Sequence, residues 1–112
     1  MSDDTNPNLA EVKKTYQLID DNFYALYAKC TSDDQKTNLI ALRDAARDAF
    51  WKAVAANLTD NHGVVTQTYS DLQAANDQIQ KDIDGLKDVS DCLETLTEAV
   101  KLAGALVTLA AA

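Results

Sequence analysis

The strongest constraint on the fold is a seven-residue repeat of apolar side chains in the second half of the chain. Seven successive positions of this repeat are apolar without a miss: Val65, Leu72, Ile79, Leu86, Leu93, Val100 and Val107. Seven-residue spacing keeps side chains on one face of an α-helix. The stretch from Val64 to Ala110 is therefore predicted to be helical, with an apolar face along its whole length.

Residues that favour turns are scarce in this chain. Its 112 residues include three Gly and one Pro, whereas a sheet protein needs turn residues about every ten positions. The length is that of one domain. We therefore expect a single all-α domain over residues 1–112, in which residues 1–7 form a flexible N-terminus.

Two amphipathic helices are predicted ahead of the repeat. Apolar residues spaced by three and four positions predict the first helix over about residues 9–30. Asn8 with Glu11 has the spacing of a capping box at its start, and Ser32 with Gln35 has the same spacing at the start of the next helix. The second helix is rich in Ala and is expected to run to a turn at 59–63.

These helix lengths leave the end of the chain unpaired. At 1.5 Å per residue the first helix rises about 33 Å, the second descends about 38 Å, and a third regains that height by about residue 90. The remaining segment, 91–112, is the most apolar part of the chain. Exposing its large side chains would cost roughly 1.5–3 kcal/mol each, so the segment must be covered.

Two arrangements cover this segment. In the first, the chain turns near 89–91, with Asp91 and Glu94 as a cap pair, and a fourth helix completes an antiparallel up-and-down bundle. In the second, the third helix continues for about 45 residues and its overhang pairs with another subunit. The unbroken repeat favours continuity, but ordinary helix lengths favour the turn, so we expect the bundle. Gly85 is the other position at which a bend fits.

Charge and motif content disfavour several function classes. The formal net charge of −8 disfavours a nucleic-acid partner. The N-terminal residues lack a secretory-signal pattern, and no stretch has the roughly 18–20 uncharged apolar residues of a membrane span, so we expect a cytoplasmic protein. The sequence has no Gly-rich phosphate loop and no CxxC, and its one histidine, His62, falls in a predicted turn. We therefore predict a protein that is not an enzyme and that has no metal or cofactor.

The apolar C-terminal segment is the predicted contact surface for a partner. Its small and branched side chains suit close packing between helices. The residues of this predicted surface are Leu93, Leu96, Val100, Ala103 and Val107. The predicted function is a protein-interaction module, such as a small acidic adaptor, a chaperone or an immunity-type binding protein, whose partner is another protein or a second copy. The alternative is a membrane-active or pore-forming helical protein that acts through the same segment.

Three further features are candidates for function. Cys30 and Cys92 are expected at the same end of the bundle, either as a redox pair or as two reduced thiols. Tyr24 and Tyr27 flank the core residue Phe23 and are expected at the rim of an interface. An acidic stripe with seven-residue spacing is expected on the solvent side, either as a docking strip or as an ordinary solvated face. Its members are Asp77, Asp84, Asp91 and Glu98.

Overall fold

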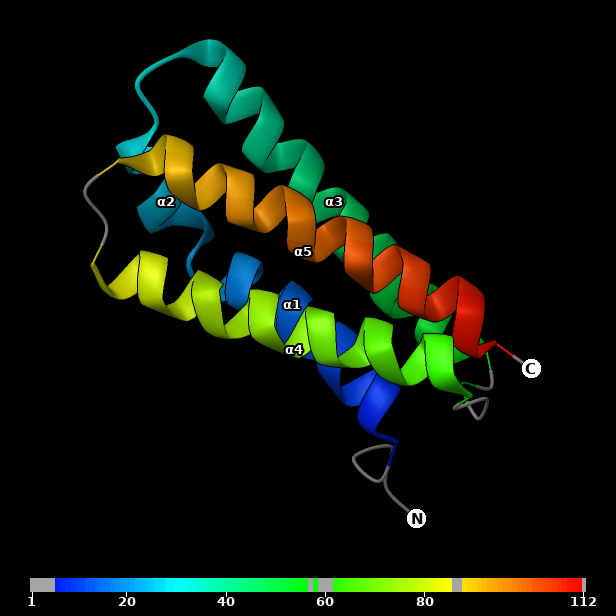
Figure 1. Cartoon of the computed structure of the whole chain (residues 1–112). Helices are drawn as coiled ribbons and strands as arrows, with labels where there is room; N and C mark the ends of the chain where they lie inside the picture. Colours follow the sequence, from blue (N-terminus) through cyan, green and yellow to red (C-terminus); the bar gives the residue numbers. More distant parts are fainter. Residues whose placement is uncertain (1–5, 57, 59–61, 86–87, 112) are drawn as a thin grey trace.

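The described part of the protein consists of α-helices and their connections. The computed structural model describes residues 6–56, 58, 62–85 and 88–111, and 89% of these residues are helical, with no strand among them. The helices of this part of the chain are α1 (Pro7–Asp21), α2 (Phe23–Lys29), α3 (Asp33–Ala55), α4 (Gly63–Asp84) and α5 (Val89–Ala110). Figure 1 shows α1, α3, α4 and α5 side by side along the length of the molecule, with the short α2 at one end.

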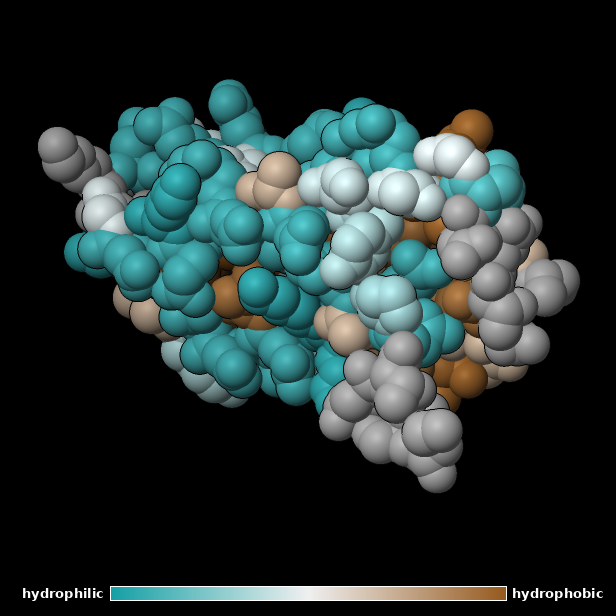
Figure 2. Space-filling view, turned by 60° about the horizontal axis from the view of Figure 1, so that its bottom comes forward, coloured by the Kyte–Doolittle hydropathy of each residue, from teal (hydrophilic) through white to brown (hydrophobic). Residues whose placement is uncertain are grey.

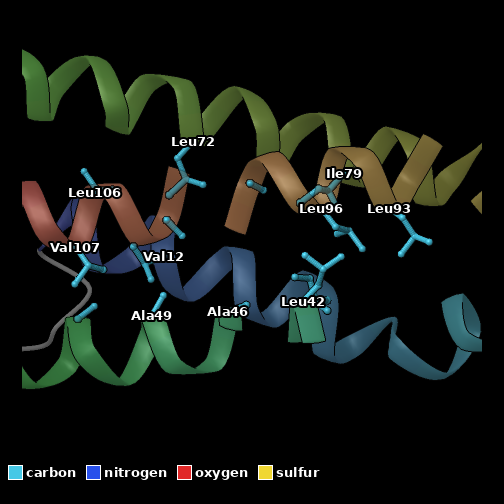
Figure 3. Close-up of a cluster of buried hydrophobic side chains, with 14 of the residues drawn as sticks. Val12, Leu42, Ala46, Ala49, Leu72, Ile79, Leu93, Leu96, Leu106 and Val107 are labelled. Atoms are coloured by element: carbon cyan, nitrogen blue, oxygen red, sulfur yellow. The ribbon is translucent and has the colours of Figure 1, made fainter. Parts of the chain in front are cut away.

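The core is centred on α5. This helix packs against α1, α3 and α4, and α1 packs in addition against α3 and α4. Side chains from these helices meet in a single apolar cluster, in which Leu96 and Leu106 of α5 lie near Leu72 and Ile79 of α4 (Figure 3). The buried positions of α5 follow one another at one, three or four residues, as expected of a helix covered on several sides. They are Val89, Cys92, Leu93, Leu96, Ala99, Ala103, Leu106, Val107 and Ala110.

The described members of the seven-residue repeat lie in two helices and not in one, and Leu86 lies outside the described residues. Helix α4 ends with Gly85 as its C-terminal cap, and α5 begins after Asp88, whose carboxylate accepts a hydrogen bond from the Ser90 amide at 2.9 Å. The alternative of one continuous helix of about 45 residues is therefore wrong. The turn expected near 89–91 lies instead before Val89, and the helix cap is Asp88 and not the expected Asp91–Glu94 pair. Glycine suits a helix end and aspartate suits a helix start, and these local preferences place the turn before residue 89.

The predicted first helix is interrupted at Asn22. Its backbone leaves helical geometry, with φ −107° and ψ 8°, and its side-chain amide donates a hydrogen bond to the Leu18 carbonyl at 2.8 Å. Asparagine side chains compete with the helix in this way for backbone partners. The Leu26 amide still donates to the Asn22 carbonyl at 2.9 Å, so helical structure resumes at once as α2. The prediction of one helix over 9–30 is corrected to two helices.

The start of α1 also differs from the prediction. The cap residue is Asn6, whose side-chain oxygen accepts hydrogen bonds from the amides of Asn8 at 3.0 Å and Leu9 at 3.2 Å. Pro7 occupies the first helical turn, where its missing N–H has no helical partner to lose. Residues 6 and 7 therefore belong to the folded domain and not to a flexible terminus, while residues 1–5 lie outside the described part.

The predicted start of α3 is confirmed. The Ser32 hydroxyl oxygen accepts a hydrogen bond from the Gln35 amide at 3.2 Å. In return, the Gln35 side-chain oxygen accepts one from the Thr31 amide at 2.7 Å. These two bonds satisfy two backbone amides at the start of α3. The arrangement is that of a capping box, except that the Gln35 side chain bonds to the amide of the residue before the cap.

A buried polar cluster joins α1 to α4. The Asn76 side-chain amide donates to the Glu11 carboxylate at 2.8 Å and to the Glu11 backbone carbonyl at 3.2 Å. The Thr15 hydroxyl donates to the Asn76 side-chain oxygen at 2.8 Å. All three residues are buried. Because unpaired polar groups are costly away from water, the cluster favours one alignment of α1 on α4 over others.

Candidate functional site

The predicted contact surface on α5 lies inside the molecule. Leu93, Leu96, Ala103 and Val107 are buried, with no more than 7% of any of them exposed, and Val100 is partly buried. The physical reason is the turn before Val89, which folds α5 back against α1, α3 and α4. The segment is therefore covered largely by its own domain, and four of these five residues are buried there.

Two of these residues also line a groove between α3 and α5. Val100 and Val107 border a hollow of about 340 Å³, beside a Lys52–Asp48 ion pair of 2.9 Å. A Cβ atom added to Gly104 would meet nothing within 4 Å, so this glycine is not a point of close helix contact. The remaining lining residues are Ala45, Ala49, Gly104 and Thr108. Small side chains thus leave a shallow surface depression here.

Both cysteines are free thiols. Cys92 is fully buried, and burial, reinforced by the nearby Asp82 carboxylate, raises the pKa of its thiol to about 11. Burial also raises the pKa of the Cys30 thiol, against the opposing charge of Lys36. Both shifts disfavour the thiolate, which is the reactive form. The starts of α3 and α5 are joined by a Gln35–Ser90 hydrogen bond of 3.1 Å, but a redox pair of the cysteines remains a prediction.

The largest apolar side chains at the surface lie mainly on α2 and α3. Tyr24 is 82% exposed and Trp51 is 59% exposed. On α3, Ile40, Trp51 and Val54 share one face with Asp44 and Arg47, because the spacing of the five residues is alternately four and three. We call the exposed apolar set the α2–α3 surface; it consists of Tyr24, Tyr27, Ile40, Trp51 and Val54.

The exposed aromatic rings are supported by rings beneath them. The Trp51 ring packs on Phe50 with centroids 5.3 Å apart, and Phe50 stacks on Tyr16 of α1 at 5.8 Å. The Tyr24 ring lies in a T-shaped arrangement with the buried Phe23 ring, with centroids 5.6 Å apart. Rings held in this way have little conformational freedom to lose when they are covered.

Basic side chains accompany this surface. The Arg43 guanidinium lies 3.8 Å from the centroid of the Phe23 ring, and the Lys36 ammonium lies 5.4 Å from that of Tyr27. Both are cation–π contacts. Arg47 forms an ion pair of 3.2 Å with Asp44 on the same helix face. Arginine and aromatic side chains together are typical of the energetically dominant part of protein interfaces.

Charge is distributed unevenly between the two halves of the chain. Residues 7–55 contain seven acidic and seven basic side chains and are neutral overall. Residues 63–112 contain eight acidic and three basic side chains, a net charge of −5. The acidic stripe is exposed as expected, but it is divided between α4 and α5. The α2–α3 surface thus lies in the neutral half, away from most of the excess negative charge.

Sequence reasoning found only part of the α2–α3 surface. Tyr24 and Tyr27 are exposed, in keeping with their expected place at a rim. Ile40, Trp51 and Val54 were not predicted as contact residues. The sequence feature that could have identified them is their helical spacing. Ile40, Trp51 and Val54 belong to a set of residues on α3 spaced by four, three, four and three positions, which places them on one face of the helix.

Other classes of site have no support in the described part of the chain. Within it, no group of three or more His, Cys, Asp or Glu residues could hold a metal ion. None of the helices described is both long and apolar enough to cross a membrane. Searches of protein-family models, curated proteins and solved structures gave no match to this chain. Inference about function therefore rests on the chemistry of its own surface.

Proposed function

We propose that this chain is a protein-interaction module without enzymatic activity, which binds a protein partner through the α2–α3 surface. The observation that carries the proposal is Trp51, more than half exposed on α3 while its ring packs on the partly buried Phe50. Monomeric proteins seldom expose several large apolar residues on one face without a binding role. Tryptophan and tyrosine are also among the residues that contribute most to binding energy.

A protein partner suits this surface better than other ligands do. The exposed face of a helix is convex, whereas small molecules bind mainly in concave pockets. The net charge of −8 opposes binding to nucleic acid. The roles of a small acidic adaptor, a chaperone or an immunity-type binding protein all fit a preorganised aromatic patch. In this proposal α5 is the scaffold that holds α3 in place, and the partner is bound elsewhere.

The proposal includes the architecture and the compartment. The helices are taken to form an antiparallel up-and-down bundle, an arrangement supported by the reversals of the chain before α3, α4 and α5 in Figure 1. The two free thiols support a reducing compartment such as the cytoplasm. The membrane-active alternative lacks comparable support, because the apolar face of α5 lies inside the bundle.

Site-specific photo-crosslinking tests the proposed function. A photoreactive phenylalanine analogue replaces Trp51 in one variant and the exposed Gln80 of α4 in a control variant, in cells that make the protein. We expect protein adducts from position 51 only, and we expect them to disappear when Ile40 and Val54 are replaced by Lys. Thermal melts verify that each variant is folded. Equal adducts from positions 51 and 80, or none from position 51, would refute the proposal.

A further inference from the structure

We infer that the partner bound by the α2–α3 surface is a second copy of this chain, packed α3 against α3 in antiparallel orientation. The inference rests on the proposed function and adds the identity and the orientation of the partner. Its basis is the order of four residues along the exposed face of α3. They are Ile40, Asp44, Arg47 and Trp51, that is apolar, acidic, basic and apolar, spaced by four, three and four positions.

This spacing reads the same from either end of the helix. When two copies of α3 are related by a two-fold axis and run in opposite directions, Ile40 lies opposite Trp51 of the partner subunit. In the same alignment Asp44 lies opposite Arg47 of the partner subunit. A two-fold axis repeats each contact. On this face apolar residues therefore meet apolar residues, and acidic residues meet basic residues, in both halves of the interface. In a parallel pair, Asp44 would instead face the partner's Asp44, which is repulsive.

The charges on this face are free to exchange partners. Asp44 and Arg47 are about half exposed, with 52% and 50% of their side chains accessible, and form an ion pair within one helix. Such a surface pair contributes only a few tenths of a kcal/mol to folding. In the antiparallel pair the same four side chains of two copies form a ring of alternating charge, partly shielded from water by Ile40 and Trp51 on either side. Shielding strengthens such interactions.

The tyrosines of α2 extend the same interface. The Lys36–Tyr27 contact places α2 beside the beginning of α3. A two-fold axis brings the beginning of one α3 next to the end of the other, where the partner's Val54 lies. Tyr24 and Tyr27 therefore face the apolar end of the neighbouring helix. This arrangement would cover all five members of the α2–α3 surface at once.

Other faces are less suited to self-association. The half of the chain that forms α4 and α5 carries a net charge of −5, so two copies meeting there repel each other. Figure 2 shows a face of the molecule on which hydrophilic side chains predominate. Among the described residues of α4 and α5, the only large apolar side chain that is mostly exposed is Val64. Charge and apolar content therefore both favour α3.

Charge reversal and mixing test this arrangement. Light scattering on a sizing column should give the wild-type chain a mass of about twice 12.2 kDa. In the proposed dimer, position 44 of each copy lies opposite position 47 of the other. Asp44→Arg and Arg47→Asp each give these two positions like charges in both contacts, so each variant alone should be monomeric. In an equimolar mixture, positions 44 and 47 of the two variants again carry opposite charges in both of their contacts. The two variants should therefore form a heterodimer, with an affinity at least tenfold above that of either variant for itself. Glu98→Arg, a matched reversal on the exposed side of α5, should leave the dimer unchanged.

Each result bears on the inference separately from the proposed function. A wild-type chain that stays monomeric overturns the inference, while adducts from position 51 to a different protein would leave the proposed function standing. A dimer that resists both reversals, or a mixture that stays monomeric, also overturns the antiparallel α3 pairing. Adducts between two copies at position 51, together with recovery on mixing, support both. Because both side chains are half exposed, the variants should fold, as circular dichroism will verify.

Discussion

Replacing Asn76 by Leu should destabilise the domain strongly, although both side chains have four heavy atoms that branch at Cγ. Asn76 is fully buried and donates to the Glu11 carboxylate at 2.8 Å and to its carbonyl at 3.2 Å. Leucine removes both donors and leaves a carboxylate buried without them. Hydrogen bonds to a charged group contribute about 1.5–3 kcal/mol, and one to a neutral group about 1 kcal/mol. We therefore expect the free energy of unfolding to fall by about 2.5–4 kcal/mol.

The double variant Glu11→Leu with Asn76→Leu separates this explanation from a simple packing defect. With both partners apolar no buried polar group is left unpaired, because the Thr15 hydroxyl also donates to the Glu11 backbone carbonyl, at 3.2 Å. Replacing a buried polar pair by apolar residues is often neutral or stabilising. The double variant should therefore recover to within about 1 kcal/mol of the wild type.

Urea unfolding at pH 7, followed by far-ultraviolet circular dichroism, measures both effects. The matched control is Gln78→Leu, an exposed position of α4 whose side chain bonds to Asp82 at 2.8 Å. It should change stability by less than about 0.5 kcal/mol. The reasoning is refuted if Asn76→Leu costs less than about 1 kcal/mol, or if the double variant is less stable than the single one.

Two further predictions concern α5. Gly104→Ala should raise the free energy of unfolding by about 0.5–1 kcal/mol, because alanine favours helix and its Cβ has free space; unchanged or lower stability in thermal melts would contradict this. Stability should also fall between about pH 9 and pH 11, because the unfolded thiol of Cys92 ionises near its usual 9.0 and the folded thiol only at about 11. The loss is at most about 3 kcal/mol. It should be missing from the pH profile of Cys92→Ala, and an identical profile in both proteins would exclude this cause.

The helical character of this chain could be predicted because it depends on local spacing. The buried positions Val65, Leu72 and Ile79 of α4 fall on the seven-residue repeat, as do Leu93 and Val107 of α5. Such spacing selects a helix with one apolar face wherever that face finds cover. The start of α3 at Ser32 could be predicted for the same reason, since its capping bonds join residues four positions apart or fewer.

The turn before α5 and the break at Asn22 were harder to place. The repeat keeps its phase across the turn, because Ile79 and Leu93 are both needed in the core although they lie on different helices. Spacing alone therefore could not distinguish one long helix from two. At Asn22 the side-chain hydrogen bond to the Leu18 carbonyl competes with helical geometry, and the spacing of apolar residues does not reveal this bond.

By itself, then, the sequence determined that the chain is helical, which faces need cover, and that the apolar segment 91–112 cannot remain in water. Only the tertiary structure decided what provides the cover. Folding back at Gly85 buries Leu96 and Ala103 among α1, α3 and α4, and so removes the predicted contact surface. The same packing leaves Trp51 and Ile40 outside, because α3 has more apolar residues than the core can cover. Helical spacing is a local property, whereas burial depends on which helices meet.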